Sequence, residues 1–259
     1  MAHNLYSQNR ILSMLPGSSR RRAFAQVDFV RLEKHQRLAT MGEPISYVYF
    51  LNSGIGSVLL TSSNGKSSEA GVFGNEGFSP SSLAVGGSRS PFDVVVQVEG
   101  DAYRMQASAF QKILAEDRTV EKIILRYVHV FALQAAYTAH SNALDNVDVR
   151  LGRWLLMCHD RVPSNRIELT HDYLALMLAV RRPSVTTSLH VLEGEGFVRS
   201  TRGVITIRNR EALENFVGSS YGAAEHEYRV LVERGADSDF SDELPSLLYG
   251  REEANTLSA

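Results

Sequence analysis

The sequence LTHDYLALMLAVRRPSVTTSLHVLEGEGFVRSTRGVITIRN, residues 169–209, decides the fold of this chain. Its pattern predicts two short helices joined by a tight turn and followed by a small β-hairpin. In the second helix, Val185, Leu189 and Leu192 recur at helical spacing, which places them on one apolar face. Helix, turn, amphipathic helix and basic hairpin in this order are typical of a winged helix-turn-helix, which lays its second helix into the major groove of DNA.

The limits of this second helix follow from its proline and glycines. Pro183 is tolerated only in the first turn of a helix, which places the N-terminus at Arg181 or Arg182. Gly194 and Gly196 end the helix. Arginine bonds guanine with two hydrogen bonds, and serine or threonine serves base edges or phosphate. The residues that we expect to contact DNA are Arg181, Arg182, Ser184, Thr186 and Thr187 on the helix, with Arg199 and Arg202 on the hairpin. The alternative is an ordinary helical hairpin whose arginines are only solvated.

Composition and charge set the broad class of the chain. It has 259 residues, of which 44% are hydrophobic and 22% charged, and it contains no apolar run of the ~20 residues that a membrane span needs. No signal peptide is recognisable at its start, so we expect a cytoplasmic protein. Residues 146–217 hold ten arginines against eight acidic residues, whereas residues 218–259 hold three basic and nine acidic ones. Because the first of these regions is only weakly basic, charge alone does not indicate nucleic acid.

In the N-terminal half, the sequence pattern changes near residue 35. Residues 5–34 show apolar residues at helical spacing, which predicts short helices. Further on, three short runs rich in β-branched and aromatic residues alternate with turn signals: YVYFL (47–51), SVLLT (57–61) and DVVVQV (93–98). Such a pattern indicates an antiparallel sandwich or barrel. Asn64-Gly65 is the strongest hairpin signal, because both residues tolerate positive φ.

The longest helical pattern covers residues 107–140, where neither glycine nor proline occurs. A heptad-like seam runs along it, formed by Ile124, Val128, Phe131, Ala135 and Thr138. One interpretation is a dimer helix that packs on its twin while its back covers the β-domain. The alternative is a core helix of a single domain. Residues 145–148 read as a hinge into the next helix.

Together these patterns predict an α+β fold. We expect an N-terminal antiparallel β-roll (jelly-roll-like) with N-terminal helices, a long dimerisation helix and a C-terminal winged helix-turn-helix. An acidic tail follows, in which residues 226–233 are expected to form a helical turn or two and no chemistry is recognisable. The corresponding ranges are 1–106, 107–145, 146–217 and 218–259.

This organisation resembles the Crp/Fnr family of bacterial transcription regulators over about residues 10–215. The family's C-terminal pattern is matched by Asp172, Leu174-Ala175, Arg182-Pro183-Ser184, Val185, Leu189, Leu192-Glu193 and Gly196-Phe197-Val198, and residues 42–78 resemble its cyclic-nucleotide-binding-like β-roll. The resemblance implies a dimer joined along the long helix, with Arg182, Pro183 and Thr187 at the main base-contacting positions. Ala179 stands where a turn glycine is common. Pro183 and Thr187 replace the Glu and Arg of many relatives, so we expect an unusual operator.

The β-roll departs from relatives that bind cyclic AMP. Those proteins resemble one another in a Gly-Glu-Leu-like triplet for the ribose and an Arg-Ser/Thr-Ala-like triplet for the phosphate. Here Ser81 occupies the Glu position and Pro80 replaces a glycine, while Arg89-Ser90 is the only match to the phosphate triplet. Ser81, Ser82, Arg89 and Ser90 therefore form the candidate effector pocket. We expect a degenerate sensor, or one tuned to another ligand or a protein partner; control by a cyclic nucleotide or another small ligand is the alternative.

The sequence lacks the residues that other kinds of sensing, or catalysis, would need. The only cysteine, Cys158, lies in an apolar helix, which favours a buried structural thiol over a redox role and excludes a clustered-cysteine metal site. No histidine occurs between His35 and His129, which argues against a metal-binding β-roll enzyme. No catalytic motif, cofactor or metal site is predicted. We expect a regulator that reads a two-fold-symmetric operator, with promoter DNA, a second copy of the chain and RNA polymerase as partners. The rivals are a constitutive DNA binder whose β-roll only dimerises and, remotely, a β-roll enzyme or a non-DNA interaction protein.

Overall fold

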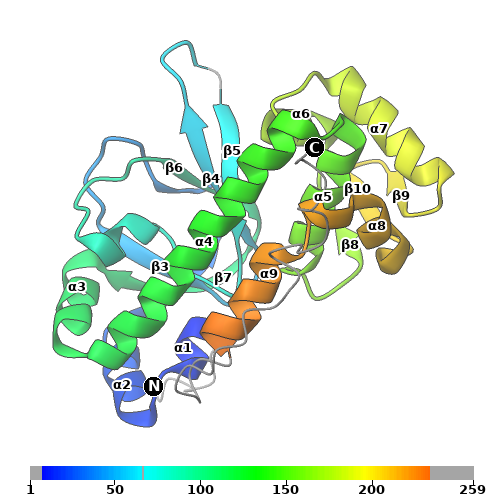
Figure 1. The fold of residues 1–259 in the computed structure, drawn as a ribbon. Coiled ribbons are helices and arrows are strands. Elements are labelled where there is room, and N and C mark those ends of the chain that lie inside the picture. The colour runs from blue at the N-terminus through cyan, green and yellow to red at the C-terminus, as the bar shows by residue number, and fades with distance from the viewer. Residues whose placement is uncertain (1–7, 66, 234–259) are drawn as a thin grey trace, which may run out of the picture.

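The computed structural model describes residues 8–65 and 67–233, which form a β-roll, a long helix and a winged helical domain (Figure 1). The β-roll is preceded by α1 (Arg10–Met14) and α2 (Gly17–Phe24). Its strands are β1 (Val27–Leu32), β2 (Arg37–Ala39), β3 (Tyr47–Leu51), β4 (Ile55–Thr61), β5 (Ser67–Phe73), β6 (Asp93–Val98) and β7 (Gly100–Gln106), with the 3₁₀ helix η1 (Ser81–Val85) between β5 and β6.

The strands form two antiparallel sheets, in the orders β1-β7-β3 and β2-β6-β4-β5. The predicted strands 47–51 and 93–98 are confirmed, and the run 57–61 lies within the longer β4. Asn64-Gly65 lies in the loop between β4 and β5, where Gly65 has a φ of 77°. The antiparallel sandwich predicted from the sequence is therefore present.

One part of the N-terminal prediction is wrong. Residues 27–32 form β1 rather than a helix, and all six pair with β7. Val27 and Leu32 are buried at the two ends of the strand, and Phe29 stacks edge-on against Tyr103 of β7. Cross-strand pairing of β-branched and aromatic residues outweighs the weak helical spacing of the apolar residues.

The long helix is divided. Where the sequence predicts one helix over residues 107–140, the structure has α3 (Ala107–Glu116) and α4 (Arg118–Leu144). Asp117 separates them with a φ of −132°, and its carboxylate accepts hydrogen bonds from the N–H groups of Thr119 and Val120. Asp117 is thus the N-cap of α4, a role that satisfies donors which the helix itself leaves unpaired. Ser19 of α2 also donates to Asp117, which ties this junction to the N-terminal helices.

An aromatic cluster packs between the β-roll and the first half of α4. Phe50, Phe78, Phe110 and Tyr127 are each at most 2% exposed. The ring of Phe78 lies 5.6 Å from those of Phe50 and Phe110 and 5.0 Å from that of Tyr127. Aromatic pairs at such distances stabilise a core beyond their buried area.

The winged domain follows α4. It contains α5 (Val147–His159), β8 (Arg166–Ile167), α6 (His171–Met177), α7 (Arg182–Gly194), β9 (Val198–Thr201), β10 (Val204–Ile207) and α8 (Arg210–Val217). The three strands form an antiparallel sheet in the order β8-β10-β9. Its core continues into the β-roll, because Ile55, Leu59 and Val72 share one hydrophobic cluster with Trp154 and Leu155 of α5.

The chain then returns to the β-roll. The segment comprises η2 (Gly218–Ser220), α9 (Ala223–Glu227) and the π-helical η3 (Tyr228–Glu233), and it runs beside α4 toward α1 (Figure 1). Tyr228 donates a hydrogen bond of 2.8 Å to the carbonyl of Glu76, and Glu233 pairs with Arg10 at 3.0 Å. The helical stretch is longer than the turn or two expected at 226–233. The rest of the acidic tail lies outside the described residues. Within the described part, no helix is both long and apolar enough to cross a membrane.

Candidate DNA-binding site

The turn between α6 and α7 is set by local hydrogen bonds and one unusual backbone conformation. Thr170 caps α6 by accepting from the N–H of Tyr173. After α6, Ala179 adopts a φ of 51°, and Val180 donates to the carbonyl of Ala175 at 3.0 Å. A left-handed conformation is uncommon for a residue with a Cβ. The turn thus has glycine-like geometry at a position that carries alanine.

Helix α7 begins as the sequence predicts. Its N-cap is Arg181, and Pro183 lies within its first turn. Val185, Leu189 and Leu192 are completely buried, which fixes the side of α7 that faces the protein. Arg181, Arg182, Pro183 and Thr187 are exposed at the outer N-terminal end, and Ser184 is half-buried.

Two of the predicted DNA contacts have partners within the protein. Arg182 lies 3.3 Å from the carboxylate of Asp172, in a pair whose side chains are 64% and 71% exposed. Such an exposed pair contributes little energy and can open at small cost. Thr186 is more firmly held, because its hydroxyl lies 3.1 Å from His171 and donates to the carbonyl of Arg182.

The wing places two arginines on the surface near α7. Arg199 lies on β9, and Arg202 lies in the β9–β10 turn beside Gly203, whose φ of 74° allows the tight reversal. Both arginines are exposed. Glu193 of α7 accepts a 2.6 Å hydrogen bond from the N–H of Ser200, which fixes the wing against the helix.

His171 was not predicted to belong to this site. It is the first residue of α6, and its ring nitrogens lie 3.1 Å from the Thr186 hydroxyl and 3.5 Å from the Ser200 hydroxyl. His171 therefore links α6, α7 and the wing. Its place directly after the Thr170 cap was visible in the sequence, but the pairing with Ser200 depends on the fold of the hairpin.

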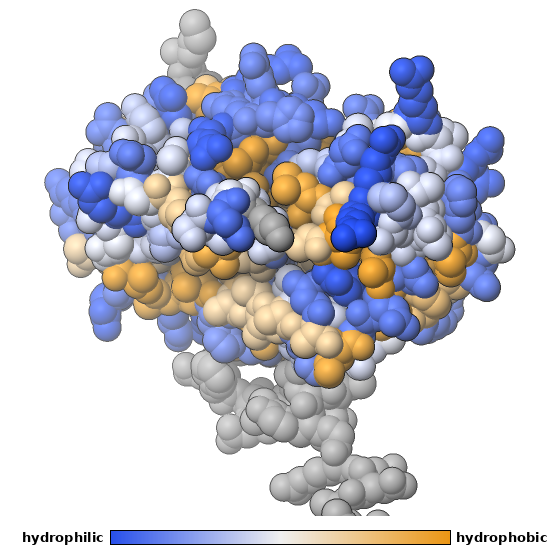
Figure 2. All heavy atoms as spheres, turned by 90° about the horizontal axis from the view of Figure 1, so that it is seen from above, coloured by the Kyte–Doolittle hydropathy of each residue, from blue (hydrophilic) through white to orange (hydrophobic). Residues whose placement is uncertain are grey.

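Helix α4 presents its faces differently from the predicted seam. Ile124 is 1% exposed and belongs to the core of its own chain. Val128, Phe131, Ala135 and Thr138 are half-buried. The outermost positions are instead Leu125, His129, Ala132, Ala136 and Ala139, each one residue further along than a member of the predicted seam. In a view from above, apolar residues gather on the side that α4 occupies in Figure 1 (Figure 2).

Two of the four candidate effector residues of the β-roll donate hydrogen bonds to backbone carbonyls. Arg89 is exposed, and its guanidinium donates to the carbonyl of Gly42 at 2.8 Å. Ser90 is buried and donates to the carbonyl of Phe92. Ser81 begins η1, and the hydroxyl of Ser82 is buried without a partner among the described residues. Arg89 and Ser90 are thus both bonded to backbone carbonyls of the roll, and the aromatic cluster packs between the roll and the first half of α4.

A buried carboxyl group joins the β-roll to the winged domain. Glu69 of β5 is 5% exposed and accepts hydrogen bonds from Ser57 and, at 2.6 Å, from the indole N–H of Trp154. Burial raises the pKa of Glu69 to about 7, and the two hydrogen bonds oppose part of that rise. The protonation state of Glu69 is thus coupled to the contact between the domains.

The remaining reactive groups form no metal centre. Cys158 is completely buried, and burial raises the pKa of its thiol well above the ordinary value. A buried thiol of this kind is a poor nucleophile. Within residues 8–65 and 67–233, no cluster of three or more histidine, cysteine or acidic residues is suited to hold a metal ion.

Sequence profiles of two domain families match the chain. The cyclic nucleotide-binding domain matches residues 29–117, and the Crp-like helix-turn-helix domain matches residues 149–216. No curated protein matches the sequence significantly.

Several solved structures share the fold. FixK2 from Bradyrhizobium japonicum is 16% identical with a TM-score of 0.61, and the match covers 73% of this chain and 96% of FixK2. A CRP-family transcriptional regulator from Thermus thermophilus is 17% identical with a TM-score of 0.62, covering 75% and 99%. The c-di-GMP responsive global regulator CLP from Xanthomonas campestris is 16% identical with a TM-score of 0.59, covering 74% and 99%. At these identities the likeness concerns the fold.

Proposed function

The chain belongs to the Crp/Fnr family of transcription regulators, and we propose that it is a sequence-specific DNA-binding regulator that reads a two-fold-symmetric operator as a homodimer. The observation that carries this proposal is the orientation of α7. Its apolar face is buried, and its N-terminal end, with Arg181 and Arg182, projects from the surface beside the basic wing. Residues at this end of a recognition helix reach base edges in the major groove.

The exposed residues divide by the contacts that they are able to make. Arg182 is the strongest candidate for direct base recognition, since a guanidinium matches the two acceptors of guanine. Thr187 is exposed one turn further along the helix and is the second candidate. Arg199 and Arg202 on the wing suit phosphate contacts, which position a protein without reading sequence. Thr186 is assigned to support of the helix, because it is bonded to His171.

Dimerisation is supported by the outer stripe of α4. The stripe combines Leu125 and His129 with three alanines, Ala132, Ala136 and Ala139, at alternating steps of four and three. This is the spacing of a coiled-coil seam, and small side chains let two helices approach closely. The proposed seam thus replaces the one predicted at 124, 128, 131, 135 and 138. A dimer would present two recognition helices to half-sites about 34 Å apart.

The proposal includes independence from cyclic AMP. The aromatic cluster around Phe78 and Tyr127 packs between the roll and the first half of α4, and Arg89 is bonded to the backbone on the surface. A buried cyclic phosphate without a charge-assisted partner would lose roughly 2–5 kcal/mol. Calorimetric titration with cyclic AMP, cyclic GMP and cyclic di-GMP tests this point; the last is included because CLP is described as responsive to it. Micromolar binding of any of them would overturn it.

Genomic footprinting of the purified protein is the experiment that tests the function. We expect protected sites with inverted half-sites whose centres lie 10–10.5 base pairs apart or a multiple of that spacing. Such sites at promoters also fit the expected contact with RNA polymerase and a cytoplasmic location. No reaction is proposed. Protection without sequence preference, or none, would contradict the function.

A further inference from the structure

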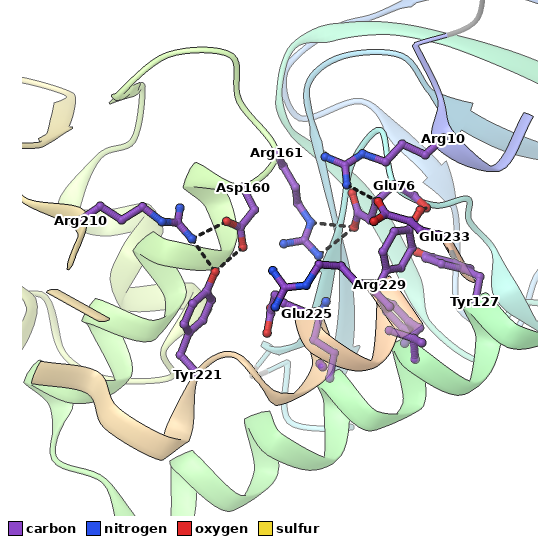
Figure 3. Close-up of a pocket in the computed structure, with 15 residues that line it drawn as sticks. Arg10, Glu76, Tyr127, Asp160, Arg161, Arg210, Tyr221, Glu225, Arg229 and Glu233 are labelled. Carbon is purple, nitrogen blue, oxygen red and sulfur yellow. Dashed lines mark hydrogen bonds and ion pairs between the residues drawn. The ribbon is translucent and has the colours of Figure 1, made fainter. Parts of the chain in front are cut away.

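A cavity of about 250 Å³ lies where the β-roll, α4, the winged domain and the returning C-terminal segment meet (Figure 3). Glu76 of the β-roll, Tyr127 and Gln134 of α4, Arg161 of the winged domain and Glu225 of α9 are among the residues that line it. The four residues of the predicted effector pocket are not part of this lining. The cavity is therefore a different site from the phosphate position of the β-roll.

Charged residues dominate this lining, and most of them are already matched. It contains four arginines and four acidic residues. Three pairs are formed: Arg161 with Glu76 at 2.8 Å, Arg210 with Asp160 at 2.7 Å, and Arg10 with Glu233 at 3.0 Å.

One cation and one anion are left over. Within the described residues, neither Glu225 nor Arg229 takes part in an ion pair; the half-buried carboxylate of Glu225 accepts from the N–H of Gly222 at 3.2 Å, and the charges of Arg161 and Arg153 act on it from a longer distance. In the close-up, Glu225 and Arg229 lie on the side of the cavity formed by the C-terminal segment, facing Arg161 (Figure 3). Among the described residues, Glu225 and Arg229 are thus the two charged groups of the lining that no direct ion pair holds.

An uncharged polar group on α4 is also left without a partner among the described residues. Gln134 is 4% exposed and lines the cavity, and its amide oxygen accepts from the N–H of Val72 at 2.8 Å, which leaves its NH₂ group for the cavity. The hydroxyl of Tyr127 is buried against the backbone near Phe78 and is not open to the cavity. Buried polar groups are nearly always satisfied, so the NH₂ group of Gln134 on the cavity wall points to a missing partner.

We propose that this cavity binds a free α-amino acid. The carboxylate of the ligand would accept from Arg229 and from the Gln134 amide, and its ammonium group would pair with Glu225. A simple organic anion fits less well, because it would leave the half-buried carboxylate of Glu225 facing another negative charge. Burial raises the pKa of Glu225, so a cationic partner would restore its ionised form.

Because of where the cavity lies, a bound ligand would affect how firmly the parts of the protein around it are held together. An amino acid held between α4 and the C-terminal segment would also stiffen the connection from Arg161 to the β-roll. A ligand that contacts several units at once favours the arrangement in which they are packed together. This consequence for operator binding rests on the proposed function; the binding itself does not.

Thermal unfolding of the full chain with each of the twenty amino acids is the first test. At a hundred times its dissociation constant, a ligand of this site should raise the Tm by ~5 °C. Calorimetry then compares the best amino acid with its hydroxy-acid analogue, which lacks the ammonium group, and with its amide, which lacks the carboxylate. Both analogues should bind at least ~10-fold more weakly. The site is overturned if no amino acid shifts the Tm, or if the hydroxy acid binds equally well.

Two variants locate the binding. Glu225→Gln and Gln134→Glu should each weaken amino-acid binding by ~10-fold or more, because each removes one polar partner while keeping shape. Glu227→Gln is the matched control, since Glu227 lies on the same helix and pairs with His129 outside the cavity. Equal affinity of Glu225→Gln and Glu227→Gln would overturn the assignment. Operator binding by the ligand-free wild type is measured in parallel, so failure of the ligand site and failure of the proposed function give different results.

Discussion

The winged domain and the β-roll use their candidate polar residues in opposite ways. In the winged domain, Arg181 at the start of α7 and Arg199 and Arg202 on the wing are exposed, and the pair of Arg182 with Asp172 is itself exposed. In the β-roll, Ser90 is buried and bonded to the backbone, while Arg89 is bonded to the backbone at the surface. The family relationship alone would not tell which region keeps its polar groups free for a partner. The hydrogen bonds distinguish the two regions.

This difference has a physical cause. A DNA-binding surface needs cations that remain hydrated and free to meet the phosphates. In the β-roll, the aromatic rings of Phe50, Phe78 and Phe110 pack together against the helices, and such a core leaves few polar groups free. Substitutions should therefore affect stability in the β-roll and binding in the winged domain.

The largest effect is expected from Phe78→Ala. Removal of this buried ring should lower the free energy of unfolding by about 3–5 kcal/mol, because the neighbouring aromatic rings cannot collapse into the space. Phe29→Ala is the control, since Phe29 is 54% exposed on β1 and its loss should cost about 1 kcal/mol or less. Urea denaturation measures both. Equal losses in the two variants would mean that the aromatic cluster around Phe78 is not a packed core.

The next effect concerns Glu69, at the contact between the two regions. Its pKa rises from 4.5 when unfolded to about 7 when folded, so the folded state binds more protons between these values. The free energy of unfolding should therefore fall as pH rises from about 4.5 to 7 and level off above that, a loss of about 3 kcal/mol from this group. Glu69→Gln should remove that part of the pH dependence.

Urea denaturation at pH 5, 6, 7 and 8 measures the dependence. Glu99→Gln is the control, because the Glu99 side chain is 65% exposed. Identical pH profiles of the wild type and Glu69→Gln would show that Glu69 is not a buried, protonated group at the domain contact.

In the winged domain, Arg182→Ala should weaken operator binding by about 1–3 kcal/mol for one lost bidentate base contact. Its effect on unfolding should stay within about 0.5 kcal/mol, since Arg182 is exposed. Arg208→Ala, at an exposed arginine after β10, is the matched control for charge. Gel-shift titration at fixed salt measures both. If the two variants bind the operator alike, Arg182 does not read a base.

The smallest effect on stability is expected at the turn between α6 and α7. Ala179→Gly should raise the free energy of unfolding by about 0.5–1 kcal/mol, because relief of the left-handed conformation exceeds the extra entropy of the unfolded glycine. Ala175→Gly, inside α6, should instead lower it by about 1 kcal/mol. Thermal unfolding of both variants checks the sign. A loss of stability in Ala179→Gly would contradict the strained turn.

The elements that could be predicted are those marked by local chemistry. Pro183 and Gly194 limit α7 in the sequence as they do in the structure. The runs 47–51 and 93–98 form β3 and β6 because β-branched and aromatic residues lie between turn signals. The helix break was missed because Asp117 looks like any exposed acid until the N–H groups of α4 are placed beside it.

The site residues that escaped prediction depend on distant contacts. No local pattern shows that Glu225 faces Arg161, or that Tyr228 reaches Glu76 from 152 residues away. The proposed dimer seam lies one residue away from the predicted one for a similar reason. Periodicity alone does not say which of the two adjacent stripes on α4 packs on its own domain, and Ile124 lies in the buried stripe.

The C-terminal segment that returns to the β-roll, residues 218–233, also has a consequence for how the protein is synthesised. Tyr228 and Val232 belong to the same hydrophobic cluster as Ile11 and Leu12. On the ribosome, the β-roll emerges first and lacks these side chains until the whole winged domain has been translated. At ordinary elongation rates this interval lasts on the order of 10 s. The N-terminal domain should therefore pass through synthesis with an uncovered apolar patch, a natural place for chaperones to hold the nascent chain.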